Sequence, residues 1–374
     1  MKNEWKLYEL GQLLIYEQPT AYIVHSTDYS ENYDIPVLTA GKSFILGHTN
    51  ETDGVFDRLP VIIFDDFTTA TQYVNFKFKV KSSAMKILNI NTELVLPKYI
   101  FYRIQIIQFD HSTHKRYWIQ EYSKLKVAIP PIEEQQRIVT RIEELFSELD
   151  SAVETLQKTK QQLEVYRQAV LKEAFAECES TVKVNDVCKH VTDGDHMPPP
   201  KAETGIPFIM ISNIDKNVIN WNGTAFVNRE YYENINDKRR PQKGDVLYTV
   251  TGSFGIPVLV DFDREFCFQR HIALLRPNNR IIQRYLYYVM QEPEVYEQAK
   301  KKSTGTAQKT VSLSVLRNIE IPFVESVKEQ ERIVAKIESQ LSVCDGIERT
   351  IEESLQQAEA MRQSILKKAF EGRL

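Results

Sequence analysis

The stretch RQAVLKEAF at residues 167–175 recurs as RQSILKKAF at residues 362–370, with six of its nine letters identical. The similarity extends upstream: residues 133–175 align without a gap with residues 328–370 and share 19 identities over 43 positions. A repeat of this length and spacing indicates two structural units of the same kind in one chain. We therefore expect two similar halves in tandem, which gives the molecule a pseudo-two-fold character.

Both copies of the repeat have the hydrophobic period of a long helix that packs along another helix. Apolar positions recur at alternating spacings of four and three residues, and the resulting 3.5-residue period is typical of a coiled-coil seam. Pro131 marks the start of the first helix, and a capping box from Ser326 to Glu329 marks the start of the second. Gln340 and Ser354 interrupt the second seam. The expected seam residues are Ile138, Ile142, Leu145, Leu149, Ala152, Leu156, Thr159, Leu163, Tyr166 and Val170 in the first copy, and Ile333, Ile337, Cys344, Ile347, Ile351, Ala358, Met361 and Ile365 in the second.

The repeat divides the chain into four segments. Residues 1–131 and 179–326 form two globular domains, while 132–178 and 327–374 form two long helices. Neither helix can bury its apolar stripe alone, so we expect the two to pair with each other. The heptad pattern by itself does not distinguish a parallel pair from an antiparallel one.

Each globular domain has the composition of a small mixed α/β domain. Short runs rich in Val, Ile, Phe and Tyr alternate with turn residues, which predicts a modest twisted sheet in each domain and an α+β fold for the whole chain. Residues 98–107, KYIFYRIQII, are among the segments expected as strands. One helix is expected from Ile282 to about Lys300.

Composition excludes several classes of protein. No apolar run approaches the roughly 20 residues that cross a bilayer, so no membrane association is expected. The N-terminal segment carries Glu4 and Glu9 and does not have the pattern of a signal peptide. Four widely spaced cysteines contain no C-x-x-C pair, and reduced thiols in a cytoplasmic protein are the simplest interpretation. The net charge of −4 lies in the two helical segments, and the remainder is neutral. A DNA-binding role would therefore need locally concentrated cations or a partner that supplies phosphate contacts.

Several loops of both globular domains have the residue types that contact nucleic acid. Hydroxyl residues, glycines and lysines let backbone N–H groups and cations approach a phosphate closely, and arginines extend the reach of the positive charge. Each loop alone fits a solvated turn slightly better than a binding surface, but the presence of such loops in both halves favours binding. The candidates are Lys42, Ser43, Lys79, Lys81, Ser83, Lys115, Arg116 and Tyr117 in the first domain, and Thr251, Ser253, Arg270, His271, Lys302, Thr304, Thr306, Gln308 and Lys309 in the second.

Motifs that resemble catalytic sites fail on closer reading. AGKS at residues 40–43 lacks the first glycine of a phosphate-binding loop, because Pro36 occupies its place. His111 and His114 have metal-ligand spacing without a third ligand nearby in the sequence. We therefore expect no catalytic site, no cofactor and no metal, and the chain is not expected to be an enzyme.

The chain resembles the specificity subunits of type I restriction–modification enzymes along essentially its whole length. The resemblance rests on the paired pattern I-P…E-Q-x-R-I-V-x-x-I that opens each long helix, and on R-Q-x-[IV]-L-K-x-A-F at each helix end. In the second domain it also rests on G-D-V-L…T-G-S-x-G at residues 244–255, Q-R-H at 269–271 and T-G-T-A-Q at 304–308.

The resemblance implies a non-catalytic subunit with two target-recognition domains, each of which reads one half of a bipartite DNA sequence. It implies that the two helices pair antiparallel as a coiled coil, set the gap between the half-sites and dock other subunits. Two methyltransferase (modification) subunits would supply S-adenosylmethionine chemistry, and restriction subunits would add ATP-driven translocation and cleavage.

Two other interpretations of the sequence stay open at this point. The chain could be a coiled-coil interaction scaffold that does not read DNA sequence, in which case the cations should be scattered and not gathered on one face. A self-contained enzyme is the third class, and a bound cofactor or metal would identify it.

Overall fold

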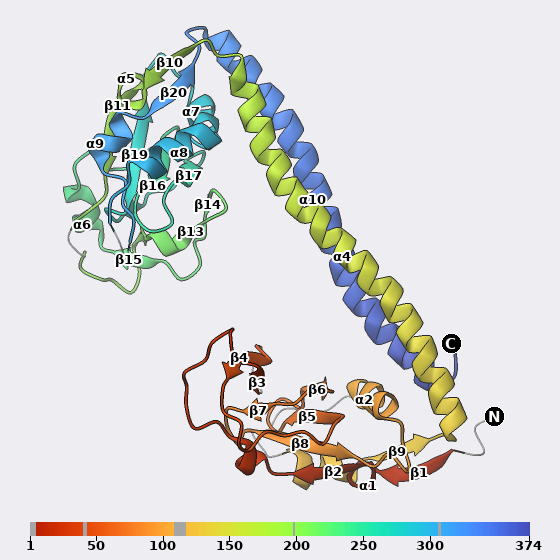
Figure 1. Cartoon of the computed structure of the whole chain (residues 1–374). Helices are drawn as coiled ribbons and strands as arrows, with labels where there is room; N and C mark the ends of the chain where they lie inside the picture. The colour runs from red at the N-terminus through yellow and green to blue at the C-terminus, as the bar shows by residue number, and fades with distance from the viewer. Residues whose placement is uncertain (1–4, 40–42, 108–116, 197–198, 306–307) are drawn as a thin grey trace. The chain divides into compact units, whose positions relative to one another are not determined.

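The computed structural model describes residues 5–39, 43–107, 117–196, 199–305 and 308–374, which form two units (Figure 1). Unit 1 comprises residues 1–156 and 353–374, and unit 2 comprises residues 157–352. Two long helices, α4 (Ile132–Ala176) and α10 (Val327–Glu371), each contribute one part to each unit. Each unit is therefore a globular domain together with a piece of both helices.

The two helices pair antiparallel, as the resemblance implied. In unit 2, Arg167 of α4 lies 2.6 Å from the carboxylate of Asp345 of α10. Further along α4, Glu173 meets Lys336 at 3.2 Å, so residue numbers fall along α10 as they rise along α4. Within each unit the helices lie side by side (Figure 1).

The repeat places the same ion pair in both units. In unit 1, Arg362 of α10 pairs with Asp150 of α4, and its guanidinium lies 4.5 Å from the centre of the Phe146 ring. Arg362 and Asp150 are the repeat equivalents of Arg167 and Asp345, which form the ion pair of unit 2. The sequence repeat is therefore a repeat of interhelix contacts.

One row of the predicted seam is displaced by one residue. Ile142, Leu163, Ile333, Ile337, Ile351 and Ile365 are buried, and Ile138 is buried as well, while Leu145, Leu149 and Leu156 are half-buried. Ile347 was expected in the seam, yet it is 42% exposed, and Tyr166 and Met361 are exposed too. Their neighbours Glu348, Arg167 and Arg362 take the inner positions and form interhelix ion pairs. A search for apolar residues alone does not find interhelix positions that are occupied by paired charged residues.

Unit 1 contains a four-stranded sheet in the order β2-β8-β5-β6 and a three-stranded sheet in the order β4-β3-β7. A short ladder between β1 and β9 connects the start of the chain to the segment that enters α4. The elements are β1 (Lys6–Glu9), α1 (Leu10–Leu13), β2 (Leu14–Glu17), β3 (Ile35–Leu38), β4 (Ile45–Thr49), β5 (Val61–Asp65), β6 (Thr71–Val74), β7 (Lys79–Val80), β8 (Met85–Ile90), α2 (Pro97–Gln105), α3 (Tyr117–Gln120) and β9 (Lys126–Ile129).

Unit 2 repeats this topology. Its four-stranded sheet has the order β11-β19-β16-β17, its three-stranded sheet the order β15-β12-β18, and β10 pairs with β20 before α10. The two globular domains are thus built alike, although their sequences are not obvious copies of each other. The elements are β10 (Ser180–Lys183), α5 (Val184–Val187), β11 (Cys188–Asp193), β12 (Ile206–Ile209), β13 (Ile214–Asp215), β14 (Val218–Ile219), β15 (Ala225–Val227), α6 (Arg229–Asn234), β16 (Val246–Thr249), β17 (Pro257–Leu259), β18 (Cys267–Phe268), β19 (Ile272–Pro277), α7 (Gln283–Val289), α8 (Pro293–Lys301), α9 (Leu313–Arg317) and β20 (Glu320–Phe323).

Two expected elements are different in the structure. KYIFYRIQII is not a strand, because residues 97–105 form helix α2, with Pro97 in its first turn and Tyr99, Ile100 and Ile104 buried. The single helix expected from Ile282 to Lys300 is two helices, α7 and α8. Pro293 cannot continue a helix, and the Glu292 carboxylate caps the second helix by accepting from the backbone of residues 294 and 295.

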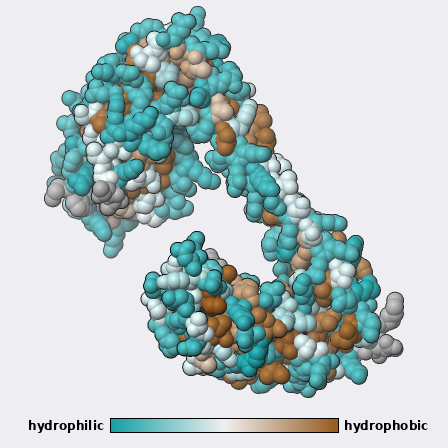
Figure 2. Space-filling view, in the orientation of Figure 1, coloured by the Kyte–Doolittle hydropathy of each residue, from teal (hydrophilic) through white to brown (hydrophobic). Residues whose placement is uncertain are grey.

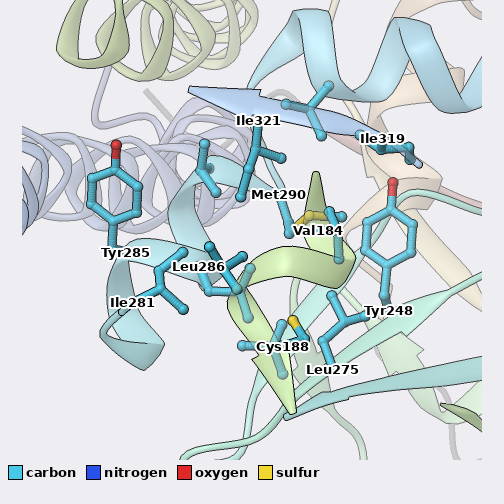
Figure 3. Close-up of a cluster of buried hydrophobic side chains, with 14 of the residues drawn as sticks. Val184, Cys188, Tyr248, Leu275, Ile281, Tyr285, Leu286, Met290, Ile319 and Ile321 are labelled. Atoms are coloured by element: carbon cyan, nitrogen blue, oxygen red, sulfur yellow. The ribbon is translucent and has the colours of Figure 1, made fainter. Parts of the chain in front are cut away.

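A hydrophobic core joins the sheet of unit 2 to its helices. Figure 3 shows Tyr248 and Leu275 of the sheet in one cluster with Tyr285 and Leu286 of α7 and with Ile321 of β20. The helix repeat contributes to the same core, because the Phe175 ring meets Tyr285 edge-on at 5.3 Å. In unit 1 the equivalent Phe370 meets Tyr99 in the same way at 5.3 Å.

A buried glutamine fixes each domain to the helix that follows it. Gln135 accepts from the backbone of Leu96 at 2.7 Å and donates to the carbonyls of Pro130 and Leu94. Its repeat equivalent, Gln330, accepts from Ile282 at 2.9 Å and donates to the carbonyls of residues 280 and 324. Both side chains are essentially inaccessible to solvent. The glutamine in the repeated E-Q-x-R sequence therefore has a structural role, which is to join the helix to the preceding domain.

The surface is polar over most of its area. Figure 2 shows hydrophilic residues over most of the visible face of each unit and hydrophobic residues in smaller patches. Among the described residues, no helix has the length and hydrophobicity that a membrane crossing needs.

Candidate nucleic-acid interface

The turn between β18 and β19 in unit 2 presents three polar side chains from a fixed backbone. The N–H of Gln269 donates to the carbonyl of Ile209 at 3.0 Å, and the N–H of Arg270 donates to the carbonyl of Asp195 at 3.0 Å. The carbonyl of His271 accepts from Val250 at 2.9 Å. Three neighbouring segments therefore hold this turn, and its side chains are positioned without a flexible loop.

Unit 1 has a turn at the same place in its topology. Between β7 and β8, the N–H of Lys81 donates to the carbonyl of Leu38 at 2.9 Å, which corresponds to the bond made by Gln269 in unit 2. Lys81 and Ser83 are both exposed on this turn. The two units thus present different side chains from equivalent positions.

A second segment of unit 2 lies beside the β18–β19 turn. Thr304 and Thr310 exchange backbone hydrogen bonds at 3.0 and 2.8 Å. The N–H of Gly252 donates to the carbonyl of Lys309 at 2.9 Å, which fixes Lys309 and Thr310 against the loop that follows β16. Gly252 has φ +69°, a left-handed backbone conformation that favours glycine.

These segments enclose a hollow of about 330 Å³. Thr251, Arg270, His271 and Gln308 line it together with Asp193. Four residues that were predicted as contacts from three separate stretches of sequence are thus gathered at one place. The hollow contains donors, acceptors and a cation, as a site that reads base edges requires.

The predicted contact residues of unit 2 are mostly accessible. Ser253, Arg270, Lys302, Thr304, Gln308 and Lys309 are exposed, and His271 is half-buried. Thr251 is only 7% exposed and lines the floor of the hollow. Thr306 lies outside the described residues.

The predicted residues of unit 1 give a mixed outcome. Ser43, Lys81 and Ser83 are exposed. Lys42, Lys115 and Arg116 lie outside the described residues, as do His111 and His114. Two predictions, Lys79 and Tyr117, have to be corrected.

Lys79 is buried and cannot face DNA. Its ammonium lies 2.9 Å from the carboxylate of Glu51 and donates to the carbonyl of Asp53 at 2.5 Å. Glu51 also accepts from the backbone of His25 and Ser26. The hydrogen bond from Ser26 and the ammonium of Lys79 lower the pKa of Glu51 to about 2. This ion pair, which we call the clamp, holds the backbone at residues 25, 26 and 53 together inside unit 1.

Tyr117 is also buried, at 1% exposure, and belongs to the core of unit 1. Its N–H donates to the carbonyl of Asp66 at 3.1 Å, and the next residue, Trp118, donates to the Asp66 carboxylate at 2.9 Å. Tyr117 therefore packs in the core of unit 1 and is not available to contact DNA.

A polar cluster next to the β18–β19 turn was missed by the sequence analysis. The Asp193 carboxylate lies 2.8 Å from the His196 ring and 3.4 Å from Arg239, and Tyr231 donates to the carboxylate of Asp195. Burial and the hydrogen bond to Asp195 raise the pKa of Tyr231. The acidic residues of T-D-G-D-H, residues 192–196, could have indicated this cluster. Within the described part of the chain, no group of three or more potential metal ligands occurs.

Known proteins of one family match this chain over most of its length. The family described as the type I restriction modification DNA specificity domain matches residues 2–165 and 178–357. The chain is 31% identical over 386 residues to the EcoR124I/EcoR124II specificity subunit of Escherichia coli, covering 96% of this chain and 93% of that protein. It is 22% identical to the MjaVIII specificity subunit of Methanocaldococcus jannaschii, covering 90% of this chain and 86% of that protein.

Solved structures show the same fold. A chain described under "complex assembly and conformational transition of the type I R-M system" matches with a TM-score of 0.69 at 19% identity, covering 100% of this chain and 99% of the other. The HsdS subunit from Thermoanaerobacter tengcongensis matches with a TM-score of 0.50 at 19% identity, covering 100% and 98%.

Proposed function

The chain belongs to the family of type I restriction–modification specificity subunits, and from this premise we propose that it reads a bipartite DNA target, one half-site with each unit. Subunits of this family recognise DNA and are not catalytic; catalysis lies in other subunits. One observation carries the proposal. Two domains of the same topology hold different polar side chains on equivalent, backbone-fixed turns.

The chemistry of these turns suits the reading of base edges in a DNA groove. Arginine, glutamine and hydroxyl side chains form the hydrogen bonds that distinguish base pairs, and lysines contact phosphates without regard to sequence. Unit 2 offers Arg270 and Gln308 for the first task, and Lys302 and Lys309 for the second. Unit 1 offers Lys81 and Ser83. Because the two sets differ, the two half-sites should differ in sequence.

We assign the gap between the half-sites to the paired helices. Each unit buries a piece of both helices in its own core. Phe175 of α4 belongs to the core of unit 2, and Phe370 of α10 belongs to the core of unit 1. Interhelix ion pairs such as Arg167 with Asp345 fix the register of the two helices within a unit. A fixed register between two reading domains would impose a fixed number of unread base pairs.

Two grooves, one in each unit, support the docking of two copies of one modification subunit. In unit 1 a groove of about 730 Å³ is lined by Phe101, Tyr102 and Glu143, and Lys98 pairs with Glu143. In unit 2 a groove of about 380 Å³ is lined by Glu338, the repeat equivalent of Glu143, together with residues that mostly differ from those of unit 1.

Tyr287 and Tyr288 of α7 line this groove beside Glu338, and Arg284 pairs with Glu338 at 2.6 Å. Two adjacent aromatic residues beside an ion-paired glutamate thus occur in both units, and such a recurring feature suits a partner that is present twice. Restriction subunits would then associate through the modification subunits.

The experiment that tests the proposal is to express the chain with the modification subunit of the same system in a host that lacks DNA methylation, and to map methylated bases genome-wide. The expected result is one split motif, with two short blocks around a fixed unread gap. Methylation without sequence preference, or none from a complex shown to assemble, would instead support a scaffold that does not read sequence.

A further inference from the structure

Arg270 differs from the other arginines of its domain. Residues 179–326 contain nine arginines, and eight of them have an ion pair, a carbonyl partner or an aromatic ring to bind. Arg276, for example, lies 2.8 Å from Asp245, and Arg317 donates to a backbone carbonyl at 2.6 Å. Within the described residues, the guanidinium of Arg270 has no such partner. An arginine that is left free while every other one is engaged is available for a ligand.

The position of Arg270 is fixed although its guanidinium is free. Its own N–H bonds to Asp195, and the residues on either side of it bond to β12 and to Val250. The side chain stands between two hollows and lines both. One hollow, of about 300 Å³, is largely apolar, with Phe208 and Met210 in its lining, and the other contains Gln308.

The surroundings of Arg270 favour a base edge over a phosphate. Asp195 lines the apolar hollow, and Asp193 lines the polar one. Phe208 and Met210 in the apolar hollow and the side-chain amide of Gln308 in the polar one suit an uncharged base edge. Lys201, which also lines the apolar hollow, is a cation that could serve a neighbouring phosphate. The planar fork of arginine matches the two acceptors, O6 and N7, that guanine presents in the major groove, and this is the commonest specific contact between proteins and DNA.

We infer that Arg270 is a specificity-determining residue and that it reads a guanine in the half-site bound by unit 2. This inference rests on the proposed function and goes further by naming the residue, the base and the unit. It also assigns the polar cluster around Asp193 a positioning role beside the arginine, because that cluster fixes the segment on which the Arg270 N–H is anchored.

The test uses the complex of the chain with the modification subunits of its own system. The wild-type motif is first mapped by methylation, and then Arg270→Ala is compared with Arg229→Gln. Arg229 is a matched control, because it is an exposed arginine of the same domain that forms its ion pair, among the described residues, with exposed Glu265. Binding is measured to duplexes that carry each of the four base pairs at every position of the motif.

We expect Arg270→Ala to abolish discrimination at one G·C pair of one half-site, and to lower the binding affinity for the wild-type sequence by roughly 5- to 150-fold. The other half-site, which serves as an internal control for folding and assembly, should keep its preference. Arg270→Gln should shift the preference at that one position toward adenine, since the amide of glutamine matches N6 and N7 of adenine. Arg229→Gln should leave the motif unchanged.

Three outcomes would overturn the inference and leave the proposed function standing. They are relaxation at a position that is not G·C, no change in the motif, and equal weakening on all sequences with a reduced salt dependence, which would identify a phosphate contact. A wild-type complex that assembles and shows no motif would overturn the proposed function, and the inference with it.

Discussion

Replacement of Gln135 or Gln330 by leucine should loosen one unit and leave the other intact. Each glutamine makes three side-chain hydrogen bonds to backbone groups from its buried position, and leucine has nearly the same volume without any of them. At about 1 kcal/mol for each lost bond, the free energy of local opening should fall by about 3 kcal/mol. In an amide exchange experiment this corresponds to a loss of protection of roughly 150-fold.

The assay is hydrogen exchange followed by mass spectrometry, because a chain with two units does not unfold in a single two-state step. Gln135→Leu should expose the amide of Leu96, and Gln330→Leu should expose the amide of Ile282. Gln136→Leu is the matched control, since Gln136 is exposed and its side chain bonds to Thr140 of the same helix at 3.3 Å. A loss below about 5-fold, or equal losses in both units, would refute the view that each glutamine fixes its own domain to its helix.

Three further predictions concern the clamp, the phosphate contacts and the helices. Glu51 has a lowered pKa, so its contribution to the stability of unit 1 is present above pH 4.5 and is lost as the pH falls toward 2; Glu51→Gln should remove that dependence from thermal unfolding curves recorded between these values. Lys302→Ala should weaken binding to all duplexes alike and reduce the slope of log K against log salt by about 1, and an unchanged slope would contradict a phosphate contact. Two matched insertions of seven residues, one in α4 after residue 157 and one in α10 after residue 354, preserve the seven-residue period of the helix seam. Because seven helical residues add about 10 Å, the insertions should lengthen the unread gap by about three base pairs and leave both half-sites unchanged. Methylation mapping would show both effects.

The long helices could be predicted because their information is local and repeated. A 3.5-residue period over many turns has few alternative explanations, and a second copy of the same phrase supports it. The segment KYIFYRIQII was misread because a short aromatic and branched run suits a strand or a buried helix equally. In the structure Tyr99 of this helix packs against Phe370, a contact with a residue far away in the sequence that the segment itself does not reveal.

The candidate site could be predicted only in part, for a similar reason. Lysines are usually exposed, and Lys79 is buried only because Glu51, on another segment, meets it in the fold. Arg270 and Gln308 were found as residue types, but no sequence pattern shows that they line the same hollow. The inner positions of Arg167 and Glu348 were missed because charges were read as solvent-facing.

The way in which unit 1 is assembled has a consequence for the order of folding during synthesis. Its core contains Leu366, Ala369 and Phe370, which the ribosome makes roughly 200 residues after residue 156, whereas unit 2 is one continuous segment. At 5–20 residues per second, the first-made domain would wait about 10–40 s for the piece that completes it, while unit 2 can finish first. During that interval the apolar surface around Tyr99 and Ile100 lacks its partner, and a nascent chain in this state is a natural client for chaperones. A stop codon that removes residues 353–374 would therefore damage the domain at the opposite end of the gene, the one that was translated first.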